Sequence, residues 1–261
     1  MNDALVADIV VGVEDGTELA QAVAVDAARN LIYVTRCGLF TGGCEPGRNA
    51  LVVLRGAEFD PATRALLRVP EVIAEISPIG LTFGGGRRAM ALDPQRNLIY
   101  VAGAFGSIGA GAGFGSTDVT VLDGLQIVDA QGQVTPNPAA AILGIIPIKV
   151  LDDLIPIVAD YSSPEIAFNA EEGLLYVVTR STAPFTEGFL AVINSALVLD
   201  ANRNFVMTPH PDEPTTLISL IATIPAGLEP EFVAIDTTRN RVIVSNQSPG
   251  ALLVLQGLSV R

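Results

Sequence analysis

Charge is scarce in this chain of 261 residues, and so are histidine and lysine. Charged residues make up 16% of the sequence, against about 25% in an average soluble domain. There is one histidine, His210, and one lysine, Lys149. Hydrophobic residues reach 49%, and the mean hydropathy is +0.47. This apolar content excludes intrinsic disorder, and the single histidine excludes a histidine-rich metal site.

Long apolar runs are also missing. The longest, around residues 139–148, stops at Lys149 and is too short for the roughly 18 residues that a membrane-spanning helix needs. A secretory signal is not visible either, because Asp3 and Asp8 interrupt the first apolar stretch and no basic segment precedes it. We therefore expect no transmembrane segment, and either a cytoplasmic protein or the mature or trimmed form of an exported one.

Positive charge is in short supply. Lysine and arginine total 15 against 28 acidic residues, which gives a net charge of −13 and an isoelectric point near 4.4. Such a field repels phosphate backbones and anionic lipid surfaces. Nucleic acid and charged membranes are not expected as partners.

Cysteine occurs twice, as Cys37 and Cys44, with six residues between them that include three glycines. Glycines let the segment curl, so a small disulfide loop is predicted. A disulfide would imply an extracellular, cell-surface or periplasmic location. Two free thiols, or half a metal site, remain alternatives, and the cytoplasm is the alternative location.

One pattern recurs four times at spacings of 67, 76 and 67 residues. Each copy has a five-residue apolar arm ending in Asp or Asn, a short polar turn, and a second apolar arm such as Leu-Ile-Tyr-Val. The pattern predicts β-hairpins, because Asp or Asn caps such a turn and Asn or Gly closes it in the left-handed conformation. The predicted turn residues are Asp26, Asp93, Asn169 and Asp236.

The first arm of each hairpin carries alanine two positions before the turn, flanked by larger apolar residues. The alanines are Ala24, Ala91, Ala167 and Ala234. Because side chains alternate along a strand, the alanines share one face and the large residues the other. A small residue at the same point of each copy suits strands that approach one another closely, as the innermost strands of a propeller do.

Further strands follow each hairpin. Third strands are predicted at Leu51–Leu54, Val119–Leu122, Leu190–Ile193 and Leu252–Leu255, and fourth strands at Val72–Ile76, about 140–146, and Leu217–Ile224. The last repeat reaches Arg261 without a fourth strand, so Ala4–Val13 is expected to supply it and to close the ring.

The sequence thus predicts an all-β fold, a four-bladed β-propeller with four antiparallel strands per blade. It forms a single domain over residues 1–261. The blades are expected at about 18–76, 85–147, 163–224, and 229–261 plus 4–13.

The repeats resemble those of the YVTN family of β-propellers. The matching residues lie at 24–35 and 91–101, and the fourth copy ends at Asn246, near the terminal Asn of the family pattern. The resemblance implies a propeller fold. The repeats here are longer and fewer than is usual in the family, and the extra length is predicted to form hairpin turns at Asp60–Arg64, Asp129–Gln133 and Asp200–Asn204.

A binding site is expected where the loops after the second strands and the loops between blades share one face. The candidate ligand- or partner-binding residues are Arg36, Arg87, Arg88, Arg180, Asn246, Asp160, Tyr161 and Glu165. Arginines gathered on one face of an acidic protein can recognise a carboxylate or an acidic partner. The alternative is that they are ordinary solvated loop charges.

Catalytic and cofactor signals are weak. The glycine-rich segment 103–117 precedes a predicted strand, whereas a phosphate loop needs a helix. His210 lies in a predicted loop with nothing to form a triad. No cofactor is expected; calcium is the one metal that oxygen ligands alone could hold, with Asp152, Asp153, Asp160 and Glu165 as weak candidates and a solvated acidic loop as the alternative.

The function expected from these features is non-enzymatic: protein–protein interaction, self-association or extracellular assembly. One alternative is a small-molecule or calcium-binding module on the loop face. Another is a lactonase-like hydrolase, by analogy of fold alone. Glu165 is the one charged residue within the four inner arms, and such an apolar axis argues against chemistry there.

Overall fold

The computed structural model describes most of the chain, in nine ranges. They are residues 18–40, 43–44, 50–77, 89–104, 117–148, 165–179, 187–209, 217–247 and 250–258. Their regular structure is β-strand with four short 3-10 helices, at Gly124–Gln126, Pro138–Ala141, Ser195–Leu197 and Thr237–Arg239. The all-β prediction is therefore confirmed.

Within the described ranges, four antiparallel sheets of three or more strands follow one another in chain order, besides one two-stranded sheet. The first contains β1 (Glu18–Asp26), β2 (Leu31–Phe40), β4 (Ala50–Arg55) and β7 (Glu71–Ile76), with the short β3 (Gly43–Cys44) beside β2. The second contains β8 (Ala89–Asp93), β9 (Leu98–Ala104), β10 (Thr117–Asp123) and β11 (Ile142–Ile148). The third contains β12 (Glu165–Asn169), β13 (Leu174–Thr179), β14 (Glu187–Asn194) and β15 (Leu220–Leu228). The fourth contains β16 (Pro230–Asp236), β17 (Arg241–Asn246) and β18 (Ala251–Gln256).

The first two strands of each sheet are the predicted hairpins. The turn after β8 shows why: Asp93 Oδ1 accepts hydrogen bonds from the backbone N–H groups of Gln95 and Arg96, each at 3.0 Å. The turns close in the left-handed conformation at Asn30, Asn97, Gly173 and Asn240. Asn and Gly tolerate that conformation best, so these residues fix the hairpin register.

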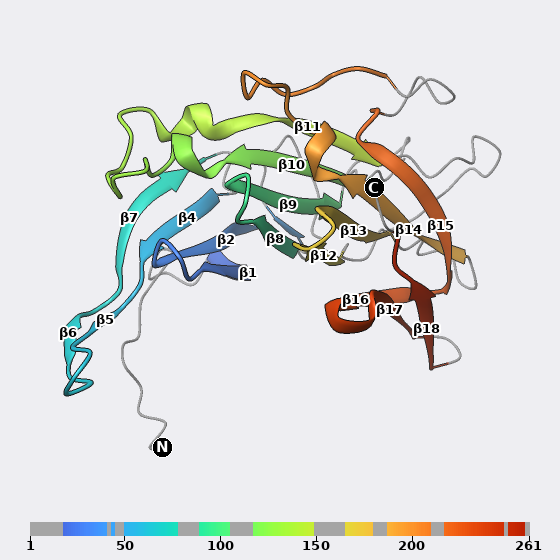
Figure 1. Cartoon of the computed structure of the whole chain (residues 1–261), viewed down its shortest axis with the longest axis horizontal. Coiled ribbons are helices and arrows are strands. Elements are labelled where there is room, and N and C mark those ends of the chain that lie inside the picture. Colours follow the sequence, from blue (N-terminus) through green and yellow to red (C-terminus); the bar gives the residue numbers. More distant parts are fainter. Residues whose placement is uncertain are drawn as a thin grey trace.

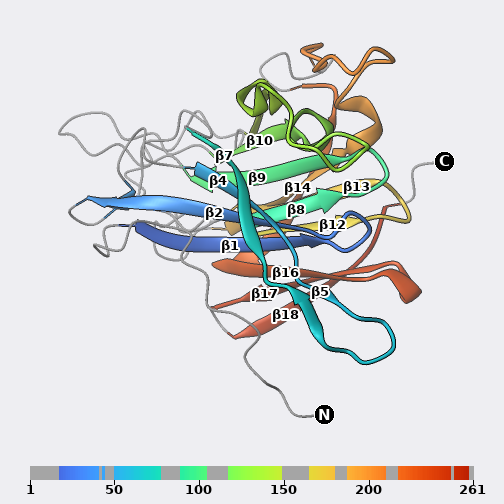
Figure 2. The ribbon, with the colours of Figure 1, turned by 90° about the vertical axis from the view of Figure 1, so that its left-hand side faces the viewer.

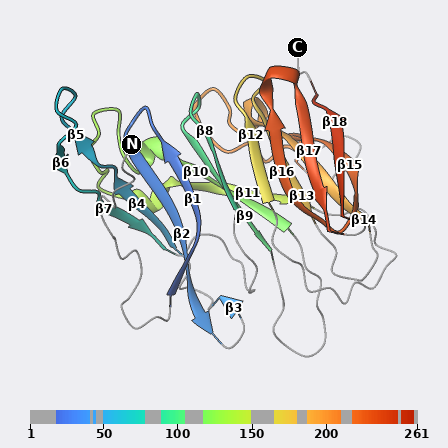
Figure 3. The ribbon, with the colours of Figure 1, turned by 90° about the horizontal axis from the view of Figure 1, so that it is seen from below.

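The sheets fan around an arc, with the first strand of each on the inside and the last on the outside (Figure 1). Strand β8 lies beside β1 on one side and β12 on the other, and β12 lies beside β16. The view from below shows the four sheets in this order, edge-on (Figure 3).

The predicted additional turns are also present. Asp60, Asp129 and Asp200 each accept hydrogen bonds from backbone N–H groups two to four residues further on. The first of these turns joins β5 (Glu58–Phe59) to β6 (Leu66–Arg68), a small hairpin that projects from the first sheet (Figure 2).

Each sheet has two apolar faces, and we name each face after the side chains that the innermost strand of the sheet places on it. The alanine face carries the alanines of that strand, and the bulky face carries the larger residues between them, such as Val23 and Val25 in the first sheet. At each junction, the alanine face of one sheet packs against the bulky face of the next. Tyr33 of the first sheet lies in one cluster with Met90 of the second, and the same pairing repeats between the second and third sheets and between the third and fourth.

Among the described strands, the bulky face of the first sheet and the alanine face of the fourth pack against no further sheet. On the bulky face of the first sheet, Val34 and Val52 are nevertheless buried, so that face is open at its inner strand. On the bulky face of the first sheet, Val23 and Val25 are 64% and 61% exposed. On the alanine face of the fourth, Phe232, Leu252 and Val254 are 51%, 69% and 52% exposed. The strand predicted at Ala4–Val13, which would close the ring, lies outside the described residues.

No helix in the described ranges is long and apolar enough to cross a membrane.

Candidate functional site

The rim that the sequence predicts as a binding face is described only in part. Arg87, Arg88, Asp152, Asp153, Asp160, Tyr161, Arg180 and His210 lie outside the described residues. Those that the structure places are Arg36 on β2, Glu165 at the start of β12 and Asn246 at the end of β17. They belong to three different sheets.

Arg36 and Asn246 are both held by their own surroundings. The guanidinium of Arg36 donates to Glu75 Oε1 at 2.6 Å, within the first sheet. Asn246 is buried and packs against Gly227, where an added Cβ would lie 2.9 Å from the Asn246 amide nitrogen. Neither side chain projects freely toward a ligand.

The two cysteines lie on neighbouring strands. Cys44 on β3 pairs through its backbone register with Leu39 on β2, two residues from Cys37. The disulfide between Cys37 and Cys44 stays a prediction.

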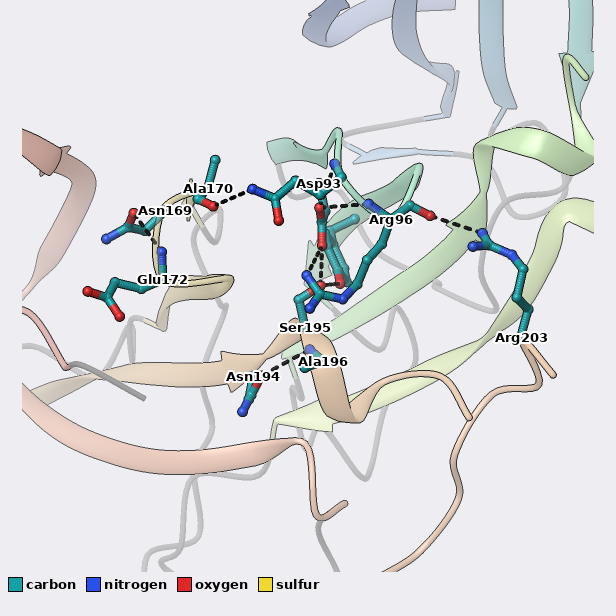
Figure 4. A network of polar contacts seen from close by, with 11 residues as sticks. Asp93, Arg96, Asn169, Ala170, Glu172, Asn194, Ser195, Ala196 and Arg203 are labelled. Atoms are coloured by element: carbon teal, nitrogen blue, oxygen red, sulfur yellow. Dashed lines mark hydrogen bonds and ion pairs between the residues drawn. The ribbon is translucent and has the colours of Figure 1, made fainter. Parts of the chain in front are cut away.

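The best-defined polar cluster lies at the opposite end of the sheets, among the hairpin turns (Figure 4). At its centre is Asp93, which is fully buried. Its Oδ1 holds the hairpin turn, and its Oδ2 lies 3.2 Å from Arg96 Nη1. The same Asp-x-x-Arg spacing gives ion pairs between Asp26 and Arg29 and between Asp236 and Arg239.

Ser195 connects this turn to the third sheet. Its hydroxyl donates to Asp93 Oδ2 and accepts a hydrogen bond from the hydroxyl of Tyr100 at 2.8 Å. Ser195 and Tyr100 are also fully buried. A chain of two hydrogen bonds therefore runs from the tyrosine through the serine to the carboxylate, across the junction between the second and third sheets.

A second connection crosses the same junction. Arg203 reaches back to the second sheet and donates to both carboxylate oxygens of Asp123, at 2.8 and 3.1 Å, and to the backbone carbonyl of Arg96 at 3.0 Å. A two-pronged contact of this kind fixes orientation as well as distance. Arg203 lies within the turn between Asp200 and Asn204 and has a positive φ of 64°, so this extra turn positions its side chain against the second sheet.

An open polar cleft of about 380 Å³ lies between the first and second sheets. Its lining includes Arg29, Arg55 and Glu58 from the first sheet and the 129–133 turn of the second. Both arginines are bound to that turn: Arg29 donates to the carbonyls of Val128 and Asp129, and Arg55 to that of Gly132 at 2.9 Å. Their donors hold the two sheets together, which leaves less charge for an anionic ligand.

These buried polar groups hold neighbouring sheets together by hydrogen bonds and ion pairs. Burial raises the pKa of Tyr33 to about 12 and also raises the pKa of Tyr100, so both hydroxyls stay protonated, and that of Tyr100 donates to Ser195. Ser195 lies beside the carboxylate of Asp93, and its side chain is fully buried. Within the described ranges, no group of three or more His, Cys, Asp or Glu side chains is placed to hold a metal ion.

Sequence reasoning identified the turn aspartates but missed Ser195, Tyr100 and Arg203 as their partners. The sequence does contain a signal for Ser195, at the position that follows the third strand of each sheet. The residue after the third strand donates its N–H to the end of the preceding hairpin turn in all four sheets, and it is Gly56, Gly124, Ser195 and Gly257 in turn. Serine is the one exception to glycine at this position.

Comparison with known proteins bears on the fold. No family model and no curated protein matches the chain. Among solved structures it is similar to hydrazine synthase of Kuenenia stuttgartiensis, with a TM-score of 0.51 and 14% identity, covering 91% of this chain and 58% of that one. It is also similar to a periplasmic gluconolactonase of Pseudomonas aeruginosa, with a TM-score of 0.45 and 15% identity, covering 92% of this chain and 57% of that one.

The chain is thus structurally similar to β-propeller proteins. At 14% identity, the similarity to hydrazine synthase is one of fold. The chain spans less than three fifths of either protein's length. The assignment to YVTN-type repeats stays a prediction.

Proposed function

We propose that the chain is a non-enzymatic β-propeller module that acts through protein–protein association, as a scaffold or an extracellular assembly unit. Its repeats would be of the YVTN type, and Cys37 and Cys44 would form a disulfide outside the cytoplasm.

The observation that carries this proposal is the group of exposed apolar side chains on each of the two end sheets of the arc. Val23 and Val25 on one, and Phe232 and Leu252 on the other, are each more than half exposed. Apolar side chains grouped on one surface, rather than scattered, mark interaction sites. Since the same types of face are covered at the three internal junctions, these two have the chemistry of an interface.

The polar groups support the same function. The buried Asp93, Ser195 and Tyr100 satisfy one another, and the arginines of the polar cleft are bound to backbone carbonyls. They make the arc rigid, which lowers the ordering cost of association.

Light scattering coupled to size exclusion, over a concentration series, tests the proposal. Association that strengthens with concentration, accompanied by a rise in the melting temperature, is expected. A chain that stays monomeric and binds no protein would contradict it. A thermal-shift screen with calcium and organic acids provides the comparison, because stabilisation by either would favour the ligand-binding alternative.

A further inference from the structure

The two exposed end faces are the two halves of one kind of junction. The first sheet exposes the inner strand of a bulky face, at Val23 and Val25, and the fourth sheet exposes an alanine face. On the second and third strands of that bulky face, Val34, Val52 and Leu54 are buried, so the open part is its inner edge. At the internal junctions these two kinds of face pack against each other, always in the same order. The bulky face of the first sheet is therefore of the kind that packs against an alanine face, and the fourth sheet carries such an alanine face at the other end of the chain.

The exposed residues match their buried counterparts position by position. Val23 and Val25 occupy the hairpin positions that Val233 and Ile235 occupy in the fourth sheet, where both lie in the cluster shared with the third sheet. At the other end, Ala234 is exposed, whereas its counterpart Ala91 is buried. The same strand position is therefore covered inside the arc and open at its end.

The open alanine face extends across the whole fourth sheet. Strand register places Ala234 opposite Ile243 and Ile243 opposite Val254, while Ser245 lies opposite both Phe232 and Leu252. Residues opposite one another in an antiparallel pair share a face. The fourth copy has Ile243 where the others have a buried tyrosine, so this face offers apolar contact without the hydroxyl link of the internal junctions.

We infer that a second copy of the same chain covers these faces, so that two arcs close head to tail into one ring of eight sheets. The bulky face of each copy would pack on the alanine face of the other, in the order used three times inside the chain. A second copy necessarily carries both required faces, and two such contacts related by a two-fold axis leave neither face open. This inference rests on the proposed function and names its partner.

Charge does not oppose the contact at its centre. The chain carries a net charge of −13, so two copies repel each other in general. The residues exposed on the two faces are uncharged at their centres, and the acidic Glu75 at the edge of the bulky face is paired with Arg36. Two copies can therefore approach through these faces at low electrostatic cost.

The test uses the whole chain and two face variants, Val25→Glu and Leu252→Lys. Both positions are more than 60% exposed, so the fold of each variant, checked by circular dichroism and melting temperature, should be kept. Leu67→Glu and Met207→Lys are matched controls, since Leu67 and Met207 are 65% and 76% exposed but lie on neither face.

Light scattering should give twice the chain mass of 27.2 kDa for the wild type and both controls. Each face variant alone should weaken the dimer by about 30-fold or more, because one charge would be buried unpaired at both contacts. Mixing the two variants should restore a mixed dimer. One of its contacts would be wild type, and the other would oppose Glu with Lys.

Different failures point to different conclusions. A dimer that Val25→Glu disrupts and Leu252→Lys does not would mean that like faces meet, which overturns the head-to-tail ring. A monomeric wild type overturns it as well, including one closed by residues 4–13. If that monomer binds another protein and Val25→Glu or Leu252→Lys abolishes the binding, the proposed function stands without the second copy; if it binds nothing, both fall.

Discussion

The hydroxyl of Ser195 in the third sheet donates a hydrogen bond to the carboxylate of Asp93 in the second, and both side chains are fully buried. The same hydroxyl accepts from Tyr100. One small side chain therefore satisfies a charged group and a phenol on the neighbouring sheet. A buried polar group without a partner costs more than the hydrogen bond itself contributes, so this position couples the stability of the two sheets.

Replacing Ser195 by alanine should lower the free energy of unfolding by about 2–3 kcal/mol, because it removes a partner from both Asp93 and Tyr100. Urea denaturation at neutral pH measures the change. Ser219→Ala is the matched control: Ser219 is equally buried, but its hydroxyl has no hydrogen-bond partner among the described residues. That control should change stability by less than about 0.5 kcal/mol. Equal losses in the two variants would contradict the role assigned to Ser195.

Replacing Arg203 by alanine should also destabilise the chain, by about 2–4 kcal/mol. It removes the two guanidinium donors from Asp123, whose side chain is almost completely buried, and leaves that carboxylate with the Leu125 N–H but without its cation. Arg239→Ala is the comparison, because the Arg239–Asp236 pair has a similar distance but is much more exposed. Its loss should cost clearly less than the loss of Arg203, because water screens an exposed pair. Chemical denaturation of both variants, with Asp123→Asn added to complete a double-mutant cycle, separates pairing from other effects.

Much of the fold could be predicted because its signals are local. The turn aspartates are followed within a few residues by the N–H groups they cap, and the closing Asn or Gly at Asn30 or Gly173 is marked by its own conformational tolerance. The alternation around Ala91 and Ala234 likewise predicts which face each side chain occupies. Such features depend on neighbours in sequence, so one chain suffices to find them.

The polar partners could not be predicted, because they meet only across junctions. Ser195 lies 102 residues from Asp93, and Arg203 lies 80 residues from Asp123. Nothing local distinguishes Arg203 from an exposed loop arginine. Arg36 shows the converse: it looks available in the sequence, but the structure pairs it with Glu75. Charge in a loop says little about a site until the fold supplies its neighbours.

Alkaline pH should weaken the fold through its buried tyrosines. The pKa of Tyr33 is raised by burial from 10.0 to about 12, so the unfolded chain loses this proton first. The stability that the neutral phenol contributes is complete below pH 10.0 and is lost as the pH rises toward about 12, at up to about 1.4 kcal/mol per pH unit for this one group. Melting temperature against pH, with tyrosinate absorbance recorded in parallel, measures the effect. Tyr33→Phe should flatten the decline, and an identical slope in that variant would contradict the assignment.

Gly250, just before β18, and Gly227 in β15 allow the cost of backbone strain to be measured apart from the cost of overpacking. The comparison also tests whether Asn246 has a structural role. Gly250 and Gly227 both have positive φ, of 76° and 87°. A Cβ at Gly250 would meet nothing within 4 Å, whereas one at Gly227 would lie 2.9 Å from the Asn246 amide nitrogen. Gly250→Ala should therefore cost about 1 kcal/mol from strain alone, and Gly227→Ala about 2–4 kcal/mol from strain and overpacking together. In Gly227→Ala with Asn246→Ala, the packing part should be recovered relative to the sum of the single variants, because the obstructing amide is gone. Strictly additive losses in denaturation would instead mean that Asn246 gives way without cost, and would restore it as a side chain free to bind a ligand.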